Sequence, residues 1–154
     1  KTDGLFYMAK VNLAMVYTQQ GKNDEAEKLL REVLTGNPEI AEINYSLALL
    51  LAETGRYEES RKFFLKAAEM MPQRPRILYN LGLLENSLGN KAAAEENLLK
   101  ALSREPDNFD FLYALTTFYI EHQQNDKALP YARKIAEKFP ERPEGKQLLE
   151  AAKK

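Results

Sequence analysis

The sequence of 154 residues predicts an all-α fold built from repeated pairs of antiparallel helices. The first observation is a period of 34 residues, marked by prolines at Pro38, Pro72, Pro106 and Pro140. Second, apolar residues within each period recur at the helical spacing of three and four residues. Third, no segment shows sustained alternation of apolar and polar residues, so we expect no sheet. Because one helix pair cannot bury its apolar face alone, the pairs must stack into an α-solenoid.

The second period shows how each repeat divides into two helices. The segment 42–53 has apolar residues at helical spacing and predicts a first helix. Gly55 follows it and supplies the positive φ that a helix C-terminus commonly needs. The segment 58–70 predicts a second helix, which Pro72 ends because proline cannot continue the hydrogen-bond ladder. The first and third repeats also carry glycine at the corner, whereas the fourth has Gln123.

Small residues recur where the two helices of each repeat are expected to cross. The pairs are Ala14 with Ala26, Ala48 with Ser60, Gly82 with Ala94, and Thr116 with Ala128. Small side chains let helix axes approach closely while larger neighbours fill the space beside them. The period therefore predicts one domain, 1–154, with repeats at about 7–40, 41–74, 75–108 and 109–142 and a capping helix at 143–154.

Composition excludes several classes of function. A net charge of −1 at pH 7 gives no general attraction to nucleic acid or anionic lipid. The chain has no Cys, which excludes thiol nucleophiles and thiolate zinc sites within it. No apolar run approaches the ~20 residues of a membrane helix, so we expect no membrane insertion. Because the chain starts at Lys1, we expect a fragment of a longer protein, and its compartment, cytoplasmic or periplasmic, stays open.

The sequence offers no set of residues that predicts catalysis, a metal site or a cofactor. No glycine-rich phosphate loop, Ser/His/Asp set or metal-ligand spacing occurs. His122 is the only His, and we expect it to be a solvated corner residue. Acidic clusters such as Glu58–Glu59 and Glu95–Glu96 are expected near the starts of second helices, where they favour the positive end of the helix dipole. We therefore predict that the chain is not an enzyme.

The repeated pattern resembles the tetratricopeptide repeat (TPR) over about residues 7–142. The third repeat shows it as Leu81, Gly82, Gly89, Ala94, Leu98, Ala101 and Pro106. Glu85 departs from the pattern, since an aromatic or apolar residue is expected there, and the fourth repeat lacks the corner glycine. The resemblance implies a right-handed α-solenoid, the TPR-like superhelix, in which the first helices line a concave groove. It also implies a protein–protein interaction scaffold that binds a peptide or helix segment of a partner.

The resemblance further implies which residues face the groove. The predicted groove residues are Met8, Val11, Met15, Tyr45, Leu49, Arg76, Tyr79, Leu83, Tyr113 and Thr117. They describe an apolar floor with three stacked tyrosines and one inward cation, Arg76. Tyrosine offers a large contact area and one polar handle, which suits protein recognition. Some TPR proteins grip a chaperone's terminal carboxylate, but the matching positions here keep only the charge of Arg76, so that clamp is absent.

Three alternatives remain open at this stage. Tyrosine is a common family choice at its position, so the tyrosines can reflect repeat consensus alone. The chain can instead be a structural or self-associating arm of a larger bacterial protein, since the stretch from Tyr113 through 129–132 is similar to arrays that follow multi-haem cytochrome-type domains. RNA binding is a minor alternative, because the related RNA readers usually have a period of 35 and are basic, whereas Glu42 and Asp110 lie along this groove.

Overall fold

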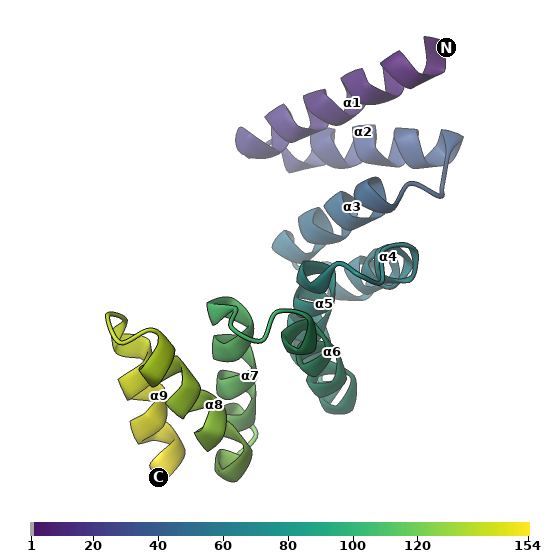
Figure 1. The fold of residues 1–154 in the computed structure, drawn as a ribbon. Coiled ribbons are helices and arrows are strands. Elements are labelled where there is room, and N and C mark those ends of the chain that lie inside the picture. Colours follow the sequence, from purple (N-terminus) through teal and green to yellow (C-terminus); the bar gives the residue numbers. More distant parts are fainter. Residues whose placement is uncertain (1) are drawn as a thin grey trace. The chain divides into compact units, whose positions relative to one another are not determined.

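The computed structural model describes residues 2–154, which form nine α-helices and no strand (Figure 1). The helices are α1 (Thr2–Gln19), α2 (Asn23–Gly36), α3 (Ala41–Glu53), α4 (Tyr57–Met70), α5 (Pro75–Ser87), α6 (Lys91–Arg104), α7 (Phe109–Glu121), α8 (Asn125–Lys138) and α9 (Pro143–Lys153). The predicted helices at 42–53 and 58–70 are confirmed as α3 and α4 to within one residue. The all-α solenoid fold class is likewise confirmed.

The chain divides into two compact units, unit 1 (Lys1–Gln73) and unit 2 (Arg74–Lys154). Unit 1 contains α1 to α4 and unit 2 contains α5 to α9. Each unit has a hydrophobic core of its own. The core of unit 1 joins α1, α2 and α3 around residues such as Leu30 and Leu47. The core of unit 2 joins α6 to α9 around residues such as Leu98 and Leu115.

The small residues at the predicted crossings are buried. Ala14, with Ala26 opposite it, is an example in the first pair. Where the residue is polar, its hydroxyl donates to a backbone carbonyl. Ser60 Oγ donates to the carbonyl oxygen of Ala48 at 2.6 Å, and Thr116 Oγ1 donates to that of Leu112 at 2.6 Å. These bonds let a hydroxyl replace a methyl group in the core without leaving an unpaired donor.

The tight corner inside each helix pair uses a residue with positive φ. Gly21, Gly55 and Gly89 have φ between 74° and 82°. Gln123 takes the same place in the fourth pair with φ of 59°, although a side chain makes that conformation costlier by roughly 1 kcal/mol. The backbone N–H of Gln124 donates to the carbonyl oxygen of Tyr119 at 2.7 Å, as in a helix-ending motif. The corner therefore survives the loss of its glycine.

The acidic clusters follow the expectation only in part. Glu58 and Glu59 lie in the first turn of α4, as predicted. The prediction was wrong for Glu95, because α6 begins four residues earlier at Lys91 and has no acidic residue in its first turn. Glu95 instead accepts a hydrogen bond from Tyr119 Oη at 2.6 Å and pairs with Lys127 Nζ at 3.3 Å. Its role is to join neighbouring repeats.

The departure from the repeat pattern at Glu85 has a structural explanation. The side chain is buried although it carries a carboxylate. Asn90 Nδ2 donates to Glu85 Oε2 at 2.7 Å, and the backbone N–H of Asn90 donates to the carbonyl oxygen of Glu85 at 2.8 Å. A buried carboxylate needs a donor, and the side chain of Asn90 supplies one, which compensates for a Glu where the other repeats have an aromatic or apolar residue.

Helix α9 packs against α8 at very short range. Gly145 is buried, and a Cβ at this position would lie 2.8 Å from Ala136 Cα. Leu148 and Ala152 are buried beside it, whereas Lys146 and Lys153 are exposed. Only glycine allows this approach of two backbones, because any side chain would meet main-chain atoms of α8.

Candidate functional site

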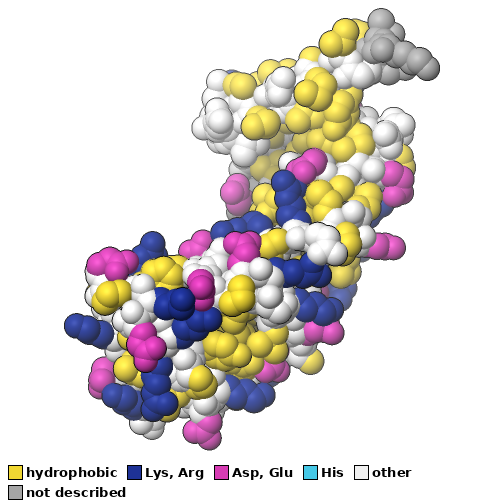
Figure 2. Space-filling model, viewed as in Figure 1, with side chains coloured by type: hydrophobic (Ala, Val, Ile, Leu, Met, Phe, Trp, Pro, Cys, Tyr) yellow, Lys and Arg dark blue, Asp and Glu magenta, His cyan; other side chains and the backbone are white. Residues whose placement is uncertain are grey.

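The predicted groove residues lie on first helices in both units. In unit 1, α1 and α3 flank an open cleft of about 310 Å³. Three of the five predicted residues in this unit line it: Val11, Met15 and Leu49. Figure 2 shows apolar side chains gathered on the visible face of unit 1. The cleft offers an apolar surface with Glu53 as its charged residue.

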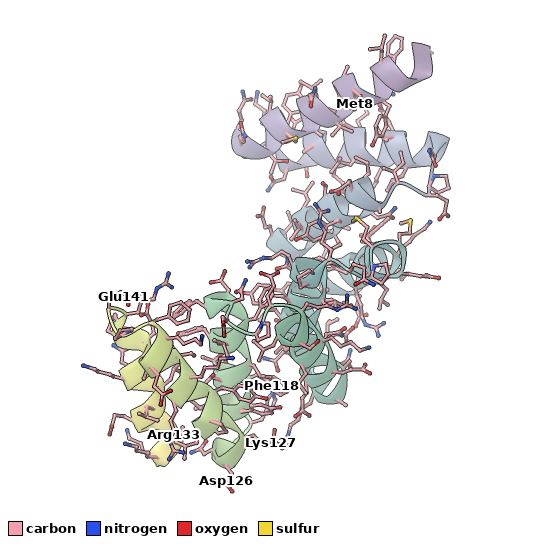
Figure 3. The ribbon with its side chains drawn as sticks, viewed as in Figure 1. Met8, Phe118, Asp126, Lys127, Arg133 and Glu141 are labelled. Carbon is pink, nitrogen blue, oxygen red and sulfur yellow. The ribbon has the colours of Figure 1, made fainter. Side chains whose placement is uncertain are left out.

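The other two predicted residues of unit 1 lie outside the lining of this cleft. Tyr45 is half-buried, and its ring centroid lies 6.0 Å from that of Phe64 on α4. Met8 projects from α1 and is exposed (Figure 3). Contact with Phe64 fixes the ring of Tyr45, while Met8 is a flexible apolar side chain that can adapt to a ligand.

In unit 2, the inward cation Arg76 is held by three neighbours. Its guanidinium carbon lies 5.0 Å from the ring centroids of both Tyr79 and Phe111. Its Nη1 donates to Asp110 Oδ2 at 3.2 Å, and both charged side chains are about half exposed. Burial, followed by the charge of Asp110, raises the pKa of Tyr79. The arrangement is a fixed, charge-balanced pair beside an aromatic surface.

The remaining predicted residues of unit 2 form an exposed part of the same helices. Leu83 is 39% exposed and Tyr113 is 38% exposed. The ring of Tyr113 stacks on Phe109 at 5.8 Å between centroids. Thr117 Oγ1 donates to the carbonyl oxygen of Tyr113 at 3.0 Å, so its hydroxyl has a partner within the helix. Tyr113 is therefore orientated by a neighbouring ring while its surface stays accessible.

Each predicted tyrosine has a phenylalanine as its ring partner. The pairs are Tyr45 with Phe64, Tyr79 with Phe111, and Tyr113 with Phe109. The repeat pattern predicts stacked tyrosines but not the phenylalanines that hold them. The repeat positions of these phenylalanines could have indicated the pairing. Phe111 lies one helical turn before Leu115, a leucine that recurs in every repeat, and Phe109 begins α7.

The expectation that His122 is a solvated corner residue was wrong. The side chain is half-buried, and its ring centroid lies 4.5 Å from that of Phe118. His122 Nε2 lies 2.8 Å from Asn86 Oδ1, and Asn86 Nδ2 donates to Glu121 Oε2 at 3.2 Å. These residues join the ends of α5 and α7 in unit 2. Both Asn86 and His122 close first helices, which is a signal that repeat register could have supplied.

Neither a metal site nor a membrane-crossing helix is found among residues 2–154. No three side chains from His, Cys, Asp and Glu come together there in a way that could hold a metal ion. No helix in this part of the chain is both long and apolar enough to cross a bilayer. The site is thus described by its apolar, aromatic and charged surface residues.

Comparison with known proteins gives two family matches. Two family models, each described as a tetratricopeptide repeat, match residues 11–75 and 86–152. A search of curated proteins gives no match.

Solved structures resemble the fold over nearly the whole chain. A crystal structure of MamA protein is 20% identical, with a TM-score of 0.89 over 97% of this chain and 81% of that one. MamA from Desulfovibrio magneticus RS-1 is 20% identical, with a TM-score of 0.87 over 96% of this chain and 83% of that one. A tetratricopeptide repeat protein from Parabacteroides merdae is 19% identical, with a TM-score of 0.90 over 97% of this chain and 59% of that one. Likeness at these identities concerns the fold alone.

Proposed function

This chain belongs to the tetratricopeptide repeat family, and on that premise we propose that its first helices bind a peptide or helical segment of a partner protein. The tetratricopeptide repeat fold is a protein–protein interaction scaffold. The proposal assigns binding to two groove segments, one on α1 and α3 of unit 1 and one on α5 and α7 of unit 2.

The observation that carries the proposal is the surface of α5 and α7 in unit 2. Exposed apolar and aromatic side chains, Leu83 and Tyr113, lie on the same two helices as the Arg76–Asp110 pair. A tyrosine already fixed by Phe109 loses little conformational entropy on binding. Arg76 can donate further hydrogen bonds and Asp110 can accept them, which suits the main chain of a bound segment.

The test is selection of peptides from a displayed random library on the native chain, followed by affinity measurement on variants. We expect Leu83→Ala combined with Tyr113→Ala to weaken the selected peptides at least tenfold, since exposed aromatic anchors dominate such interfaces. Leu99→Ala on α6 is the matched control, because Leu99 is 36% exposed but lies on a second helix.

Both variants replace exposed side chains, so their thermal unfolding should stay close to that of the native chain. Unchanged peptide affinity in a folded Leu83→Ala, Tyr113→Ala variant would contradict the assignment to unit 2. Equal loss in the Leu99→Ala control would move binding to the second helices. Adding Tyr79→Ala then asks whether the Arg76 cluster contributes beyond the exposed pair.

A further inference from the structure

We propose that the cleft between α1 and α3 of unit 1 binds a lysine or arginine side chain of the partner segment. This inference rests on the peptide binding proposed above and names the chemistry that unit 1 recognises. The cleft measures about 310 Å³, and apolar residues line it together with Thr18, Gln19, Ser46 and Glu53. That volume is at the small end of the range for ligand pockets, roughly 300–1,000 Å³, so it suits one side chain of a bound segment.

The opening of this cleft is a property of the repeat and does not depend on what precedes α1. Leu49 occupies the same repeat position as Met15, and Tyr113 occupies the same position as Val11. Leu49 is 36% exposed although α2 packs against α3, and Tyr113 is 38% exposed although α6 packs against α7. A second helix packed before a first helix therefore leaves these positions accessible to a ligand.

One end of the cleft combines a carboxylate with the C-terminal ends of two helices. Helix α1 ends at Gln19 and α3 ends at Glu53, and both residues line the cleft. A helix C-terminus carries a partial negative charge, and neither α1 nor α3, as described over 2–19 and 41–53, has a basic residue in its last turn. This end of the cleft is therefore negative, whereas Val11 and Leu49 make the rest of it apolar.

The carboxylate of Glu53 has no partner among the side chains of the described residues. It is exposed, and it forms no hydrogen bond or ion pair within that part of the chain. Lys22 and Arg56 are the cations that follow the two helix ends in the sequence, and both are held elsewhere. Lys22 Nζ lies 5.7 Å from the ring centroid of Tyr17, and Arg56 pairs with Glu27 and with a carboxylate of α4.

Unit 2 shows how the same repeat position is satisfied when the chain itself supplies a donor. Glu121 ends α7 as Glu53 ends α3, and its Oε2 accepts a hydrogen bond from Asn86 Nδ2 of α5 at 3.2 Å. Thr18 of α1 occupies the repeat position of Asn86, but its hydroxyl donates to the carbonyl oxygen of Ala14 at 2.9 Å. The donor that Asn86 provides in unit 2 is thus missing in unit 1, and a bound cation can take its place.

A lysine or arginine side chain matches both parts of the cleft. Its aliphatic stem can lie along Met15 and Leu49 while its charged head pairs with Glu53. Methionine is flexible, so the apolar part can adapt to a stem of either length. An acidic side chain would be repelled by the negative end, and an apolar one would remove water from Glu53 without supplying a donor. Charge complementarity therefore selects a basic residue of the partner segment.

The experiment is selection of peptides from a displayed random library on the native chain and, in parallel, on a Glu53→Lys variant. We expect the native chain to enrich lysine or arginine at one peptide position and the variant to enrich aspartate or glutamate there. Peptides selected on the native chain should bind a Glu53→Gln variant about fivefold more weakly, the upper range for an ion pair that water still reaches. The matched control is Glu69→Lys, which makes the same charge change at an exposed position in the last turn of α4, a second helix.

Thermal unfolding establishes that each variant is folded, and Glu53→Lys should be at least as stable as the native chain because a cation suits a helix C-terminus. If the native and Glu53→Lys chains enrich the same residues, this inference is overturned while peptide binding stands. If Glu69→Lys changes the enriched residues as Glu53→Lys does, net charge explains the preference, and the cleft is again overturned as its source. A native chain that enriches no peptide contradicts the binding proposal itself, and this inference then fails with it.

Discussion

Leu13 in unit 1 and Leu115 in unit 2 occupy the same repeat position but have opposite environments. Leu13 is 42% exposed on α1, whereas Leu115 is fully buried beneath α6 and α8. The last helix pair of unit 2 is also covered, because α9 packs on α8 at Gly145. One repeat pattern therefore produces an open face in unit 1 and a continuous core in unit 2, depending on what packs beside it.

The two units also differ in how their neighbouring repeats are tied together at the surface. In unit 1, Arg31 and Arg56 each contact both Glu27 and Glu59, forming a four-membered ion-pair ring between α2 and the start of α4. In unit 2, Tyr119 is almost fully buried and donates to Glu95. The repeat pattern thus fixes the buried apolar positions, whereas the surface contacts between neighbouring repeats can be ion pairs or can involve an aromatic side chain.

The largest predicted effect is the loss of stability when Leu115 is truncated, compared with truncation of the equivalent Leu13. We expect Leu115→Ala to lower the free energy of unfolding by about 2–5 kcal/mol, because it leaves a cavity in the core of unit 2. Leu13→Ala should cost under about 1 kcal/mol, since much of the side chain is already in water. Urea unfolding followed by circular dichroism measures both values. Equal losses would mean that Leu13 is covered in solution.

The second prediction concerns the close approach of α8 and α9. Gly145→Ala should destabilise unit 2 by about 1–3 kcal/mol, because the new Cβ would meet the Ala136 backbone, which cannot move aside cheaply. Gly36→Ala at the end of α2 is the matched control, since no atom lies within 4 Å of the Cβ that it adds. The control should be neutral or stabilising by up to about 1 kcal/mol. Faster hydrogen exchange confined to α9 and α8 would locate the damage.

Much of the fold could be predicted because its signals are local. Pro72 and Gly55 mark where helices end by their own backbone chemistry, and the segment 42–53 shows helical spacing by itself. The same local logic fixed the crossing residues, of which Ala48 is fully buried. Even the corner at Gln123 could be placed, although its positive φ is enforced by the surrounding repeat and is not a preference of glutamine.

Side-chain partners across repeats could not be predicted in the same way. Register places Arg76 beside Asp110, but long side chains have several rotamers, and only packing decides that Arg76 also lies against Phe111. His122 was misjudged because its partner Asn86 lies one repeat away. The exposure of Leu13 was also hidden, since burial depends on the neighbouring helix and the repeat pattern is the same whether or not one is present.

The smallest predicted effect tests the ionic link of unit 1 by pH. The hydrogen bond from Arg31 holds the pKa of Glu59 below its usual range; burial opposes this effect, and the hydrogen bond from Arg56 adds to it. The unfolded chain therefore takes up this proton at higher pH than the folded chain does. The contribution of Glu59 to stability is complete above the unfolded pKa of about 4.3 and is lost as pH falls through the lowered folded value.

Glu59→Gln should therefore flatten the acid limb of the stability curve of unit 1. The loss at neutral pH should stay below about 1 kcal/mol and shrink further in high salt, because the side chain is more than a third exposed and its charge is screened. Glu58→Gln is the matched control, since it removes an exposed carboxylate from the same first turn of α4 and shares the helix-dipole contribution. If both variants respond alike to pH and salt, the ring adds nothing beyond that dipole, and apolar stacking alone joins the two repeats of unit 1.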